Sequence, residues 1–299
     1  MTENRNNNRK QIRGHLLSML CVIAWGTSFL VSKTLMAKLS PVQLMFLRFV
    51  IAWLAIWILY PKWYFRWREE GQFILLSLLG NTLYYLAENT ALRLTLASNV
   101  SILVSAAPLV SLFLLRLFDK NERLSPRQTV GVCIAFFGVL LVVFNGVFVL
   151  ELNPLGDLLA LAAAVCWALY GFAARRTVEK YDTFLCTRKL MFYGMLTTAP
   201  LVMAEGSLMA GIRMMDLGDV CGLLYLGVIC SALCYLMWNK AISEIGAMKA
   251  NLYVYVVPVV TMIASVIFLG EKISPVGAAG VALVVGGMLL GSIKSGGTN

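Results

Sequence analysis

The chain has 299 residues, of which 60% are hydrophobic and only 13% are charged. A soluble domain of this length cannot bury so much apolar surface, and the mean hydropathy of +0.79 is typical of a protein that lies in a bilayer. The net charge of +10 does not indicate nucleic-acid binding, because the basic residues are spread over many loops. Composition therefore excludes an ordinary soluble domain and favours an all-α integral membrane protein.

The apolar segments are continuous and about 20 residues long, which predicts membrane-spanning helices rather than the short alternating strands of a barrel. Charged residues, prolines and glycines mark the approximate ends of these helices. The ten predicted spans are 15–35, 41–60, 72–92, 96–117, 128–148, 156–175, 184–203, 219–240, 247–269 and 275–293.

The basic residues predict how the chain is oriented in the cell membrane. If the N-terminus lies inside, the inner segments hold 17 of the 25 Lys and Arg residues and the outer segments hold five. The positive-inside rule then places both termini in the cytoplasm. The first residues contain no small-residue cleavage site, so we expect a cytoplasmic tail there and not a signal peptide.

Two segments half a chain apart are nearly the same, Asn-Glu-Arg-Leu-Ser-Pro at 121–126 and Gly-Glu-Lys-Ile-Ser-Pro at 270–275. A similar shift of 150 residues pairs Pro108 with Pro258. Each half then has an odd number of helices, so the sequence predicts two inverted five-helix repeats. The predicted organisation is a cytoplasmic tail at 1–14, a first repeat at 15–148, an outer linker at 149–155, a second repeat at 156–293 and a cytoplasmic tail at 294–299.

Four short motifs in this repeat resemble those of a known family. They are Ala24-Trp25-Gly26, Leu47-Arg48-Phe49, Ala107-Pro108 and Gly270-Glu271-Lys272. In their order and repetition they resemble the drug/metabolite transporter superfamily, and in particular its EamA-type ten-helix carriers. The resemblance implies a carrier of small metabolites, often an exporter of amino acids or related solutes, that works by alternating access between the two halves.

Arg48 and Glu88 are ionisable residues within the outer halves of two predicted spans. A charged side chain in a span costs about 2.5–3.5 kcal/mol on insertion scales, so it usually faces the interior of the bundle and has a partner. The two residues lie at similar depths, within about 5 Å at the helical rise. We expect them to pair with each other or to bind a charged substrate group in turn; a purely structural ion pair is the alternative.

Polar residues cover one broad side of the predicted span 72–92, among them Tyr84, Glu88 and Asn89. Such a face is costly in lipid, so we expect it to line a cavity or to contact another helix. The corresponding span of the second half carries Tyr235 and Asn239. This pattern predicts an asymmetric substrate site, while interhelical hydrogen bonds explain Asn89 and Asn239 almost as well.

Aromatic residues near the middle of two predicted spans provide candidate walls for such a site. Trp25 and Trp167 lie far from the membrane interfaces where tryptophan usually occurs, and Tyr170 follows Trp167 by one helical turn. They could enclose an apolar or aromatic group of the substrate. Packing in the core is the more frequent role of a buried aromatic ring.

Three further residues are candidates for a gate or a hinge. Pro108 and Pro258 are predicted in the middle of their helices, where a proline removes a backbone hydrogen bond and acts as a hinge or a static kink. Arg188 lies near the inner end of its span. It either extends to the lipid head groups or forms an inner gate as the counterpart of Arg48.

No motif of an enzyme is present: the only histidine is His15, and the sequence lacks a P-loop and the motifs of metal-dependent and serine hydrolases. We therefore expect no cofactor and no metal. Transport would be facilitated or driven by an ion gradient, with Glu88 as the candidate carrier of a coupling proton, because apolar surroundings favour the neutral carboxyl group.

The expected partners are a small-molecule substrate and the lipid bilayer. A flippase for lipid-linked substrates and a multidrug efflux carrier are the alternatives to a metabolite exporter. Glycines in the predicted fifth and tenth spans, such as Gly131 and Gly287, predict close helix packing, with a homodimer contact as a secondary role.

Overall fold

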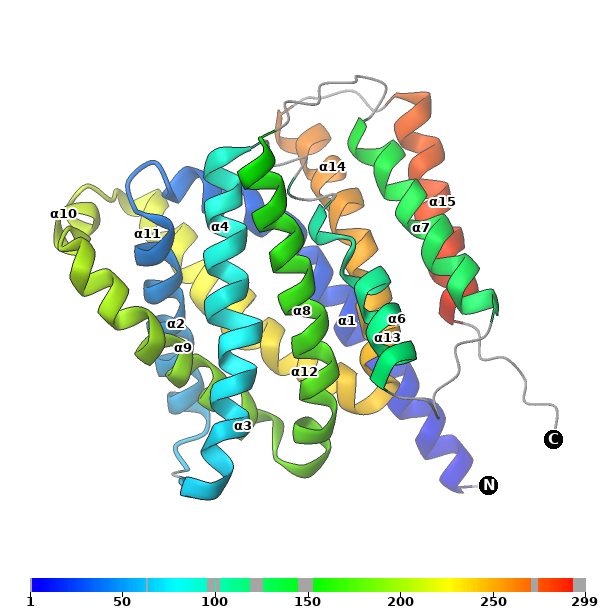
Figure 1. Cartoon of the computed structure of the whole chain (residues 1–299), viewed down its shortest axis with the longest axis horizontal. Helices are drawn as coiled ribbons and strands as arrows, with labels where there is room; N and C mark the ends of the chain where they lie inside the picture. Colours follow the sequence, from blue (N-terminus) through cyan, green and yellow to red (C-terminus); the bar gives the residue numbers. More distant parts are fainter. Residues whose placement is uncertain are drawn as a thin grey trace.

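A computed structural model describes residues 2–62, 64–95, 100, 103–118, 126–144, 153–269 and 274–292. Its regular structure in these ranges is helical, without strands (Figure 1). The first half contains α1 (Thr2–Leu35), α2 (Pro41–Leu59), α3 (Trp67–Ser77), η1 (Leu78–Leu83), α4 (Tyr84–Leu94), α6 (Ala107–Phe118) and α7 (Pro126–Phe144). The second half contains α8 (Pro154–Lys180), α9 (Thr183–Glu205), α10 (Leu208–Arg213), α11 (Leu217–Leu224), η2 (Tyr225–Leu233), α12 (Cys234–Ile245), α13 (Ala247–Leu252), η3 (Tyr253–Tyr255), α14 (Val256–Leu269) and α15 (Pro275–Ser292).

Several helices are long and apolar enough to cross a bilayer. By length and composition, five such segments occur in the described ranges, and two shorter apolar helices, Pro126–Leu141 and Pro275–Gly291, accompany them. The five are Asn8–Leu35, Pro41–Leu59, Pro154–Lys180, Leu217–Ile245 and Ala247–Ala264. This confirms the predicted class, an all-helical protein with membrane-spanning helices.

The N-terminal helix is longer than predicted. The sequence places residues 1–14 in a tail, whereas α1 begins at Thr2. Asn and Arg side chains reduce hydropathy but do not break a helix, and Arg13 continues the helix into a contact with α12, where its Nε donates to Glu244 over 2.9 Å. His15 also lies 2.9 Å from the hydroxyl of Tyr253. The helix therefore extends beyond the predicted span 15–35, and the placement of residues 1–14 as a cytoplasmic tail stays a prediction.

Two of the predicted continuous helices contain a π-helical segment. One is η1, between α3 and α4, and the other is η2, between α11 and α12. Gly80 in η1 lies against the ring of Tyr170, where an added Cβ would come within 2.5 Å of the ring. Such segments are frequent at functional sites because they rotate the following residues relative to a regular helix. Here η1 leads directly into Tyr84.

Pro108 and Pro258 lie at the beginnings of helices, not in their middles. Pro108 is the second residue of α6 and follows a turn at 105–106, and Pro258 is the third residue of α14 and follows η3. The first turn of a helix accepts proline without losing a hydrogen bond. The predicted spans 96–117 and 247–269 are thus interrupted just before these prolines, so each proline follows a break in its span and does not lie within a regular helix. Their role as hinges or static kinks stays a prediction.

Close packing of glycines joins α7 and α15, as predicted (Figure 1). An added Cβ on Gly138 would lie 2.6 Å from the backbone nitrogen of Val284, and one on Gly287 would lie 2.6 Å from the carbonyl oxygen of Gly131. Backbone surrounds these positions, so only glycine lets the helices approach so closely.

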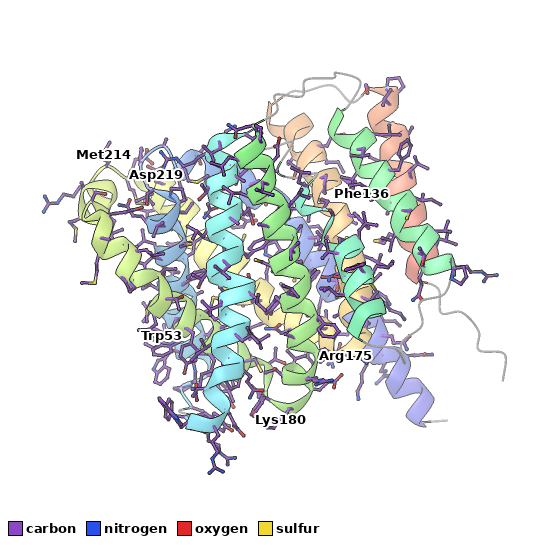
Figure 2. The ribbon with its side chains drawn as sticks, viewed as in Figure 1. Trp53, Phe136, Arg175, Lys180, Met214 and Asp219 are labelled. Atoms are coloured by element: carbon purple, nitrogen blue, oxygen red, sulfur yellow. The ribbon has the colours of Figure 1, made fainter. Side chains whose placement is uncertain are left out.

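The remaining helices enclose the centre of the molecule. Figure 1 shows α4 and α8 side by side, with α2, α9 and α11 at one end of the molecule and the α7–α15 pair at the other. Helix α1 begins, and α15 ends, on the same side of the molecule. Figure 2 shows the side chains, with Arg175 and Lys180 on that side and Met214 and Asp219 on the opposite one.

Some sequence predictions fall outside the described residues. The repeated segments at 121–126 and 270–275 do so except for Pro126, Ser274 and Pro275. The predicted tail at 294–299 and most of the predicted linker at 149–155 also fall outside them.

Candidate functional site

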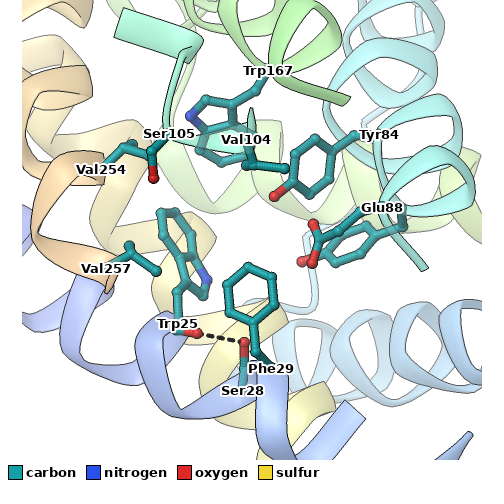
Figure 3. A pocket seen from close by; sticks show the side chains of 11 residues that line it. Trp25, Ser28, Phe29, Tyr84, Glu88, Val104, Ser105, Trp167, Val254 and Val257 are labelled. Carbon is teal, nitrogen blue, oxygen red and sulfur yellow. Dashed lines mark hydrogen bonds between the residues drawn. The ribbon is translucent and has the colours of Figure 1, made fainter. Parts of the chain in front are cut away.

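A central cavity lies between α1, α4, α8, α14 and the segment that precedes α6 (Figure 3). Its empty space is about 540 Å³, including space that is continuous with the exterior. The lining is mostly aromatic and aliphatic, with few polar groups, as is usual for small-molecule sites. The lining residues are Trp25, Ser28, Phe29, Tyr84, Tyr85, Glu88, Val104, Ser105, Trp167, Val254 and Val257.

Trp25 and Trp167 come from different halves of the chain and meet at this cavity. Their ring centroids are 5.3 Å apart and the rings are perpendicular, while the Tyr84 ring lies 5.2 Å from that of Trp167. The Nε1 atom of Trp25 donates a hydrogen bond to the carbonyl oxygen of Cys230 over 3.0 Å, which fixes the orientation of the indole. Three of the predicted aromatic residues therefore form one wall of a single cavity.

Glu88 is the acidic residue that lines the cavity. Its side chain points into the space beside Tyr84 (Figure 3), and the residue is only 8% exposed. The Tyr84 hydroxyl interacts with the Glu88 carboxylate, but the Oε2 atom of Glu88 is buried and has no hydrogen-bond partner among the described residues. A buried oxygen without a donor is costly, so this position favours a bound cation, a donor group or a proton.

Arg48 lies behind the cavity wall and does not pair with Glu88. No ion pair within 4.0 Å joins the two residues in the described part of the chain. Instead, Nη2 of Arg48 donates to the hydroxyl of Tyr85 over 3.0 Å, and Nε donates to Ser231 over 3.2 Å. The structure thus corrects the prediction of a direct pair: Arg48 contacts the cavity through Tyr85, which lines it.

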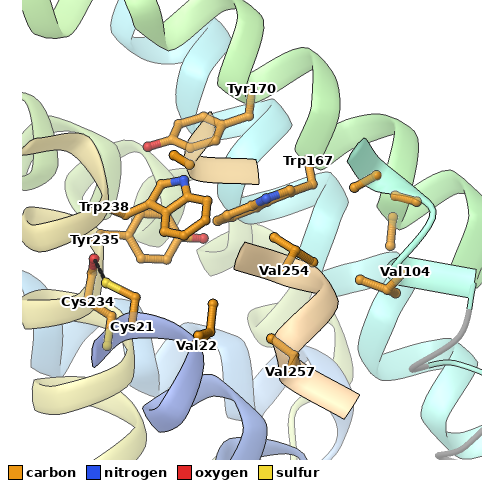
Figure 4. Packing of buried hydrophobic residues seen from close by; sticks show 14 of the residues in the cluster. Cys21, Val22, Val104, Trp167, Tyr170, Cys234, Tyr235, Trp238, Val254 and Val257 are labelled. Carbon is orange, nitrogen blue, oxygen red and sulfur yellow. Dashed lines mark hydrogen bonds between the residues drawn. The ribbon is translucent and has the colours of Figure 1, made fainter. Parts of the chain in front are cut away.

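Tyr170, Tyr235 and Asn239 form a hydrogen-bonded layer next to the wall. The Tyr170 hydroxyl donates to Asn239 over 2.5 Å, Asn239 donates to Thr187 over 3.1 Å, and the Tyr235 hydroxyl donates to the carbonyl oxygen of Gly80 over 2.5 Å. Figure 4 shows the rings of this layer packed around Trp167. These three predicted site residues do not line the cavity; they support the residues that do.

Asn89 lies outside the cavity lining. Its amide nitrogen is 3.5 Å from the carbonyl oxygen of Pro41, and its Oδ1 has no partner among the described residues. The interhelical contact is weak, but it agrees with the structural alternative for this residue.

The sequence did not single out several lining residues. Ser28 and Phe29 follow Trp25 by three and four positions, so helical spacing could have indicated them. Val104 and Ser105 enter the cavity because the chain leaves the helical path before α6, which no periodic pattern predicts.

Arg188 lies at a second cavity, away from the central one. The second cavity lies between α2 and α9, and Lys189 also lines it. The prediction of Arg188 as an inner gate stays a prediction.

One side of this second cavity carries an ion pair between Lys189 and Glu70. Glu70 precedes the predicted span 72–92 and therefore lies outside it. Lys189 Nζ is 2.8 Å from both carboxylate oxygens of Glu70, and the Tyr193 hydroxyl donates to the same carboxylate over 2.5 Å. Burial alone would raise the pKa of Glu70, but the hydrogen bonds from Lys189, Tyr193 and the backbone of Arg66 hold that pKa below its usual value.

The described residues contain no group of three or more His, Cys, Asp or Glu side chains that could hold a metal ion. The central cavity offers one acid, hydroxyl groups and aromatic rings, a set suited to binding an organic solute.

Long apolar helices around an aromatic internal cavity define a helical integral membrane protein, and the cavity has the size and the lining that small-molecule sites usually have. The chain belongs to the EamA-like transporter family, which matches residues 12–144 and 154–293. This confirms the resemblance found in the sequence and identifies a member of a membrane transporter family.

Relatives over most of the chain carry transporter names. A protein of Archaeoglobus fulgidus named an uncharacterized transporter is 30% identical over 287 residues, which cover 94% of this chain and 97% of the relative. A probable amino-acid metabolite efflux pump of Escherichia coli strain K12 is 23% identical and covers 92% of this chain and 93% of its own. A probable terminal-alkyne amino-acid exporter of Streptantibioticus cattleyicolor is 26% identical over 65% of this chain and 63% of its own. A solved crystal structure has the same fold, with a TM-score of 0.70, 20% identity and coverage of 93% of this chain and 95% of its own.

Proposed function

We propose that the protein exports a small amine-bearing metabolite, an amino acid or a related solute, across the cell membrane. In this proposal the substrate binds in the central cavity, and the two halves of the chain open it alternately to either side. The observation that carries the proposal is the buried, unpartnered Oε2 of Glu88 beside the rings of Trp25 and Trp167.

The chemistry of the cavity supports a substrate with an ammonium group and an apolar part. The ammonium group would donate to Glu88 and the apolar part would pack on the indole rings, which also attract cations. Arg48 would hold Tyr85 in place and bring a positive charge near the substrate carboxylate. The names of two relatives, an amino-acid metabolite efflux pump and a terminal-alkyne amino-acid exporter, agree with this substrate class.

The proposed mechanism includes ten spans in two inverted five-helix repeats. Two separate family matches, one in each half of the chain, support the duplication. We also propose that both termini lie in the cytoplasm, because the basic residues are concentrated in the predicted inner loops. Glu88 would bind either the substrate cation or a proton, so that one side chain couples export to proton entry.

Efflux of cationic drugs is the second candidate function. The same acid and the same aromatic rings would bind an aromatic cation. Within the described part of the chain, the lining residues include no lysine or arginine, which argues against a lipid-linked anionic substrate in this cavity.

Thermal stabilisation of the purified protein by a panel of amino acids, nucleosides and cationic drugs tests the proposal. We expect amino acids with apolar side chains to stabilise the wild type and not the Glu88→Gln variant. Glu179→Gln is the matched control, because Glu179 is an exposed acid whose partner is Arg175 at 3.8 Å.

Exchange in proteoliposomes at several pH values tests the coupling. We expect the exchange rate to depend on pH in the wild type and not in Glu88→Gln. In the thermal-stabilisation assay, stabilisation by cationic drugs alone would favour the second candidate function. Equal stabilisation of the wild type and Glu88→Gln by amino acids would show that Glu88 does not bind the substrate.

A further inference from the structure

The second cavity is separate from the proposed substrate site and has an empty space of about 500 Å³. It lies between α2 and α9, near the ends of these helices on the side of the molecule where Lys180 lies (Figure 2). The lining residues are Trp53, Trp57, Tyr64, Phe65, Arg188, Lys189, Phe192 and Tyr193.

One of the two cations in this cavity is already neutralised. Lys189 contacts both oxygens of the Glu70 carboxylate, and Tyr193 donates to the same group. Lys189 therefore adds little net charge for a ligand.

Among the described residues, Arg188 has no acidic partner. It is only 3% exposed, and within the described chain its one hydrogen bond runs from Nη1 to the carbonyl oxygen of Tyr60, over 2.8 Å. Its guanidinium carbon lies 4.9 Å from the ring of Trp57 and 5.8 Å from the ring of Tyr60. A guanidinium has five N–H donors in a planar fork, so most of its capacity is unused. A buried cation of this kind favours an anionic ligand that accepts from the remaining donors.

The walls beside Arg188 are aromatic. The ring of Trp53 lies 5.7 Å from that of Trp57 and 6.1 Å from that of Phe192. The neighbouring surface of α2 is apolar as well, since Ile58 is 78% exposed and Leu59 is 60% exposed. The cavity thus combines one buried positive charge with an apolar entrance on a lipid-facing helix. A small hydrophilic anion has no apolar part to contact that entrance, whereas an amphiphile has one.

We propose that this second cavity binds an anionic amphiphile, with its phosphate or carboxylate group on Arg188 and its apolar chain on Trp53, Trp57 and Phe192. The ligand is either an anionic phospholipid of the bilayer or a free amphiphile such as a fatty acid. This ligand binds outside the proposed substrate site and is not the transported solute.

Binding of matched ligand pairs to the purified full-length protein, measured by native mass spectrometry, tests this proposal. Dodecyl phosphate and dodecylphosphocholine share one alkyl chain but differ in net charge, and phosphatidylglycerol and phosphatidylcholine form the corresponding lipid pair. We expect the wild type to bind the anionic member of a pair about tenfold more tightly or better, the size of a charge-assisted contact. Preference within both pairs identifies a lipid site, and preference within the dodecyl pair alone identifies a site for free amphiphiles.

Arg188→Gln should abolish this preference, and Arg188→Lys should retain part of it, because lysine keeps the charge and loses the planar fork. Arg176→Gln is the matched control. Arg176 is an exposed residue near the C-terminal end of α8, and it does not line the cavity. Trp53→Leu should weaken both members of a pair and leave the preference unchanged.

Equal binding of anionic and zwitterionic members by the wild type would overturn the proposal. An equal loss of preference in Arg176→Gln and Arg188→Gln would overturn it too, because charge at the membrane surface would then explain the binding. If Arg188→Gln does not fold, the wild-type pairs and the Arg188→Lys variant decide the question.

Discussion

The Nη2 atom of Arg48 donates a hydrogen bond to the hydroxyl of Tyr85 over 3.0 Å, and its guanidinium carbon lies 4.4 Å from the centre of the same ring. Arg48 also donates to Ser231, so one buried side chain links α2, α4 and η2. Tyr85 lines the central cavity and Arg48 does not. The charge of Arg48 is therefore separated from the cavity by one side chain, that of Tyr85.

Replacement of Arg48 by methionine separates the functional role of its charge from its structural role. A buried charge without an acidic partner contributes little to stability, and an apolar side chain of similar length often replaces it at little cost. We expect the melting temperature of Arg48→Met to stay within a few degrees of the wild type, while transport in proteoliposomes falls about tenfold or more. Tyr85→Phe, which keeps the ring and loses the hydroxyl, should have a smaller effect. A large loss of melting temperature with normal transport would show that Arg48 is structural.

Trp167 should contribute binding energy through its contacts with Trp25 and Tyr84. Replacement of Trp167 by alanine removes a wall of the cavity, and we expect the dissociation constant of a stabilising substrate to rise about tenfold or more. Trp167→Phe should retain most of the affinity. Trp67→Ala is the control, because Trp67 is 83% exposed and does not line the central cavity. Isothermal titration or thermal shift would measure the constants, and equal affinity in Trp167→Ala and the wild type would contradict the role of the wall.

The sequence predicted the class of fold and part of the site because both depend on helical spacing and on the cost of polar groups in lipid. Trp25, Tyr84, Glu88 and Trp167 all line one cavity, as expected from their positions in the spans. These residues are visible in a linear sequence because each is unusual for the middle of an apolar helix.

The direction of a side chain could not be predicted in the same way. Arg48 and Glu88 were placed at similar depths, but whether they meet depends on the rotation of each helix and on side-chain rotamers. The π segment η1 changes that rotation just before Tyr84, and no pattern in the sequence marked it. The helix starts at Pro108 and Pro258 were missed because the preceding residues are as apolar as the helices themselves.

Two adjacent glycines of α15 should respond differently to alanine. An added Cβ on Gly287 would lie 2.6 Å from the carbonyl oxygen of Gly131, whereas one on Gly286 would meet nothing within 4 Å. We expect Gly287→Ala to lower the free energy of unfolding by about 1–3 kcal/mol, because backbone atoms must move apart. Gly286→Ala should be neutral or slightly stabilising, since alanine favours the helix. Melting curves of both variants under the same conditions measure the difference, and equal melting temperatures would contradict the backbone contact between α7 and α15.

Protonation of Glu70 should weaken the contact between α3 and α9. The folded state holds the pKa of Glu70 below its usual value of 4.5, because Lys189 and Tyr193 donate to the ionised carboxylate. A lowered pKa in the folded state stabilises the protein above the pKa of the unfolded chain, and this stabilisation is lost as the pH falls through the lower, folded pKa. We therefore expect the melting temperature of the wild type to fall between about pH 5 and about pH 3 by more than that of Glu70→Gln.

The Glu70→Gln variant supplies the control for this titration. Near neutral pH it should melt at a lower temperature than the wild type, because Lys189 is then buried without its acidic partner. Its own decline at low pH reports the titration of all other carboxyl groups, so the difference between the two curves belongs to Glu70. Parallel curves for the two proteins across this range would mean that the Glu70–Lys189 pair does not stabilise the folded state through its charge.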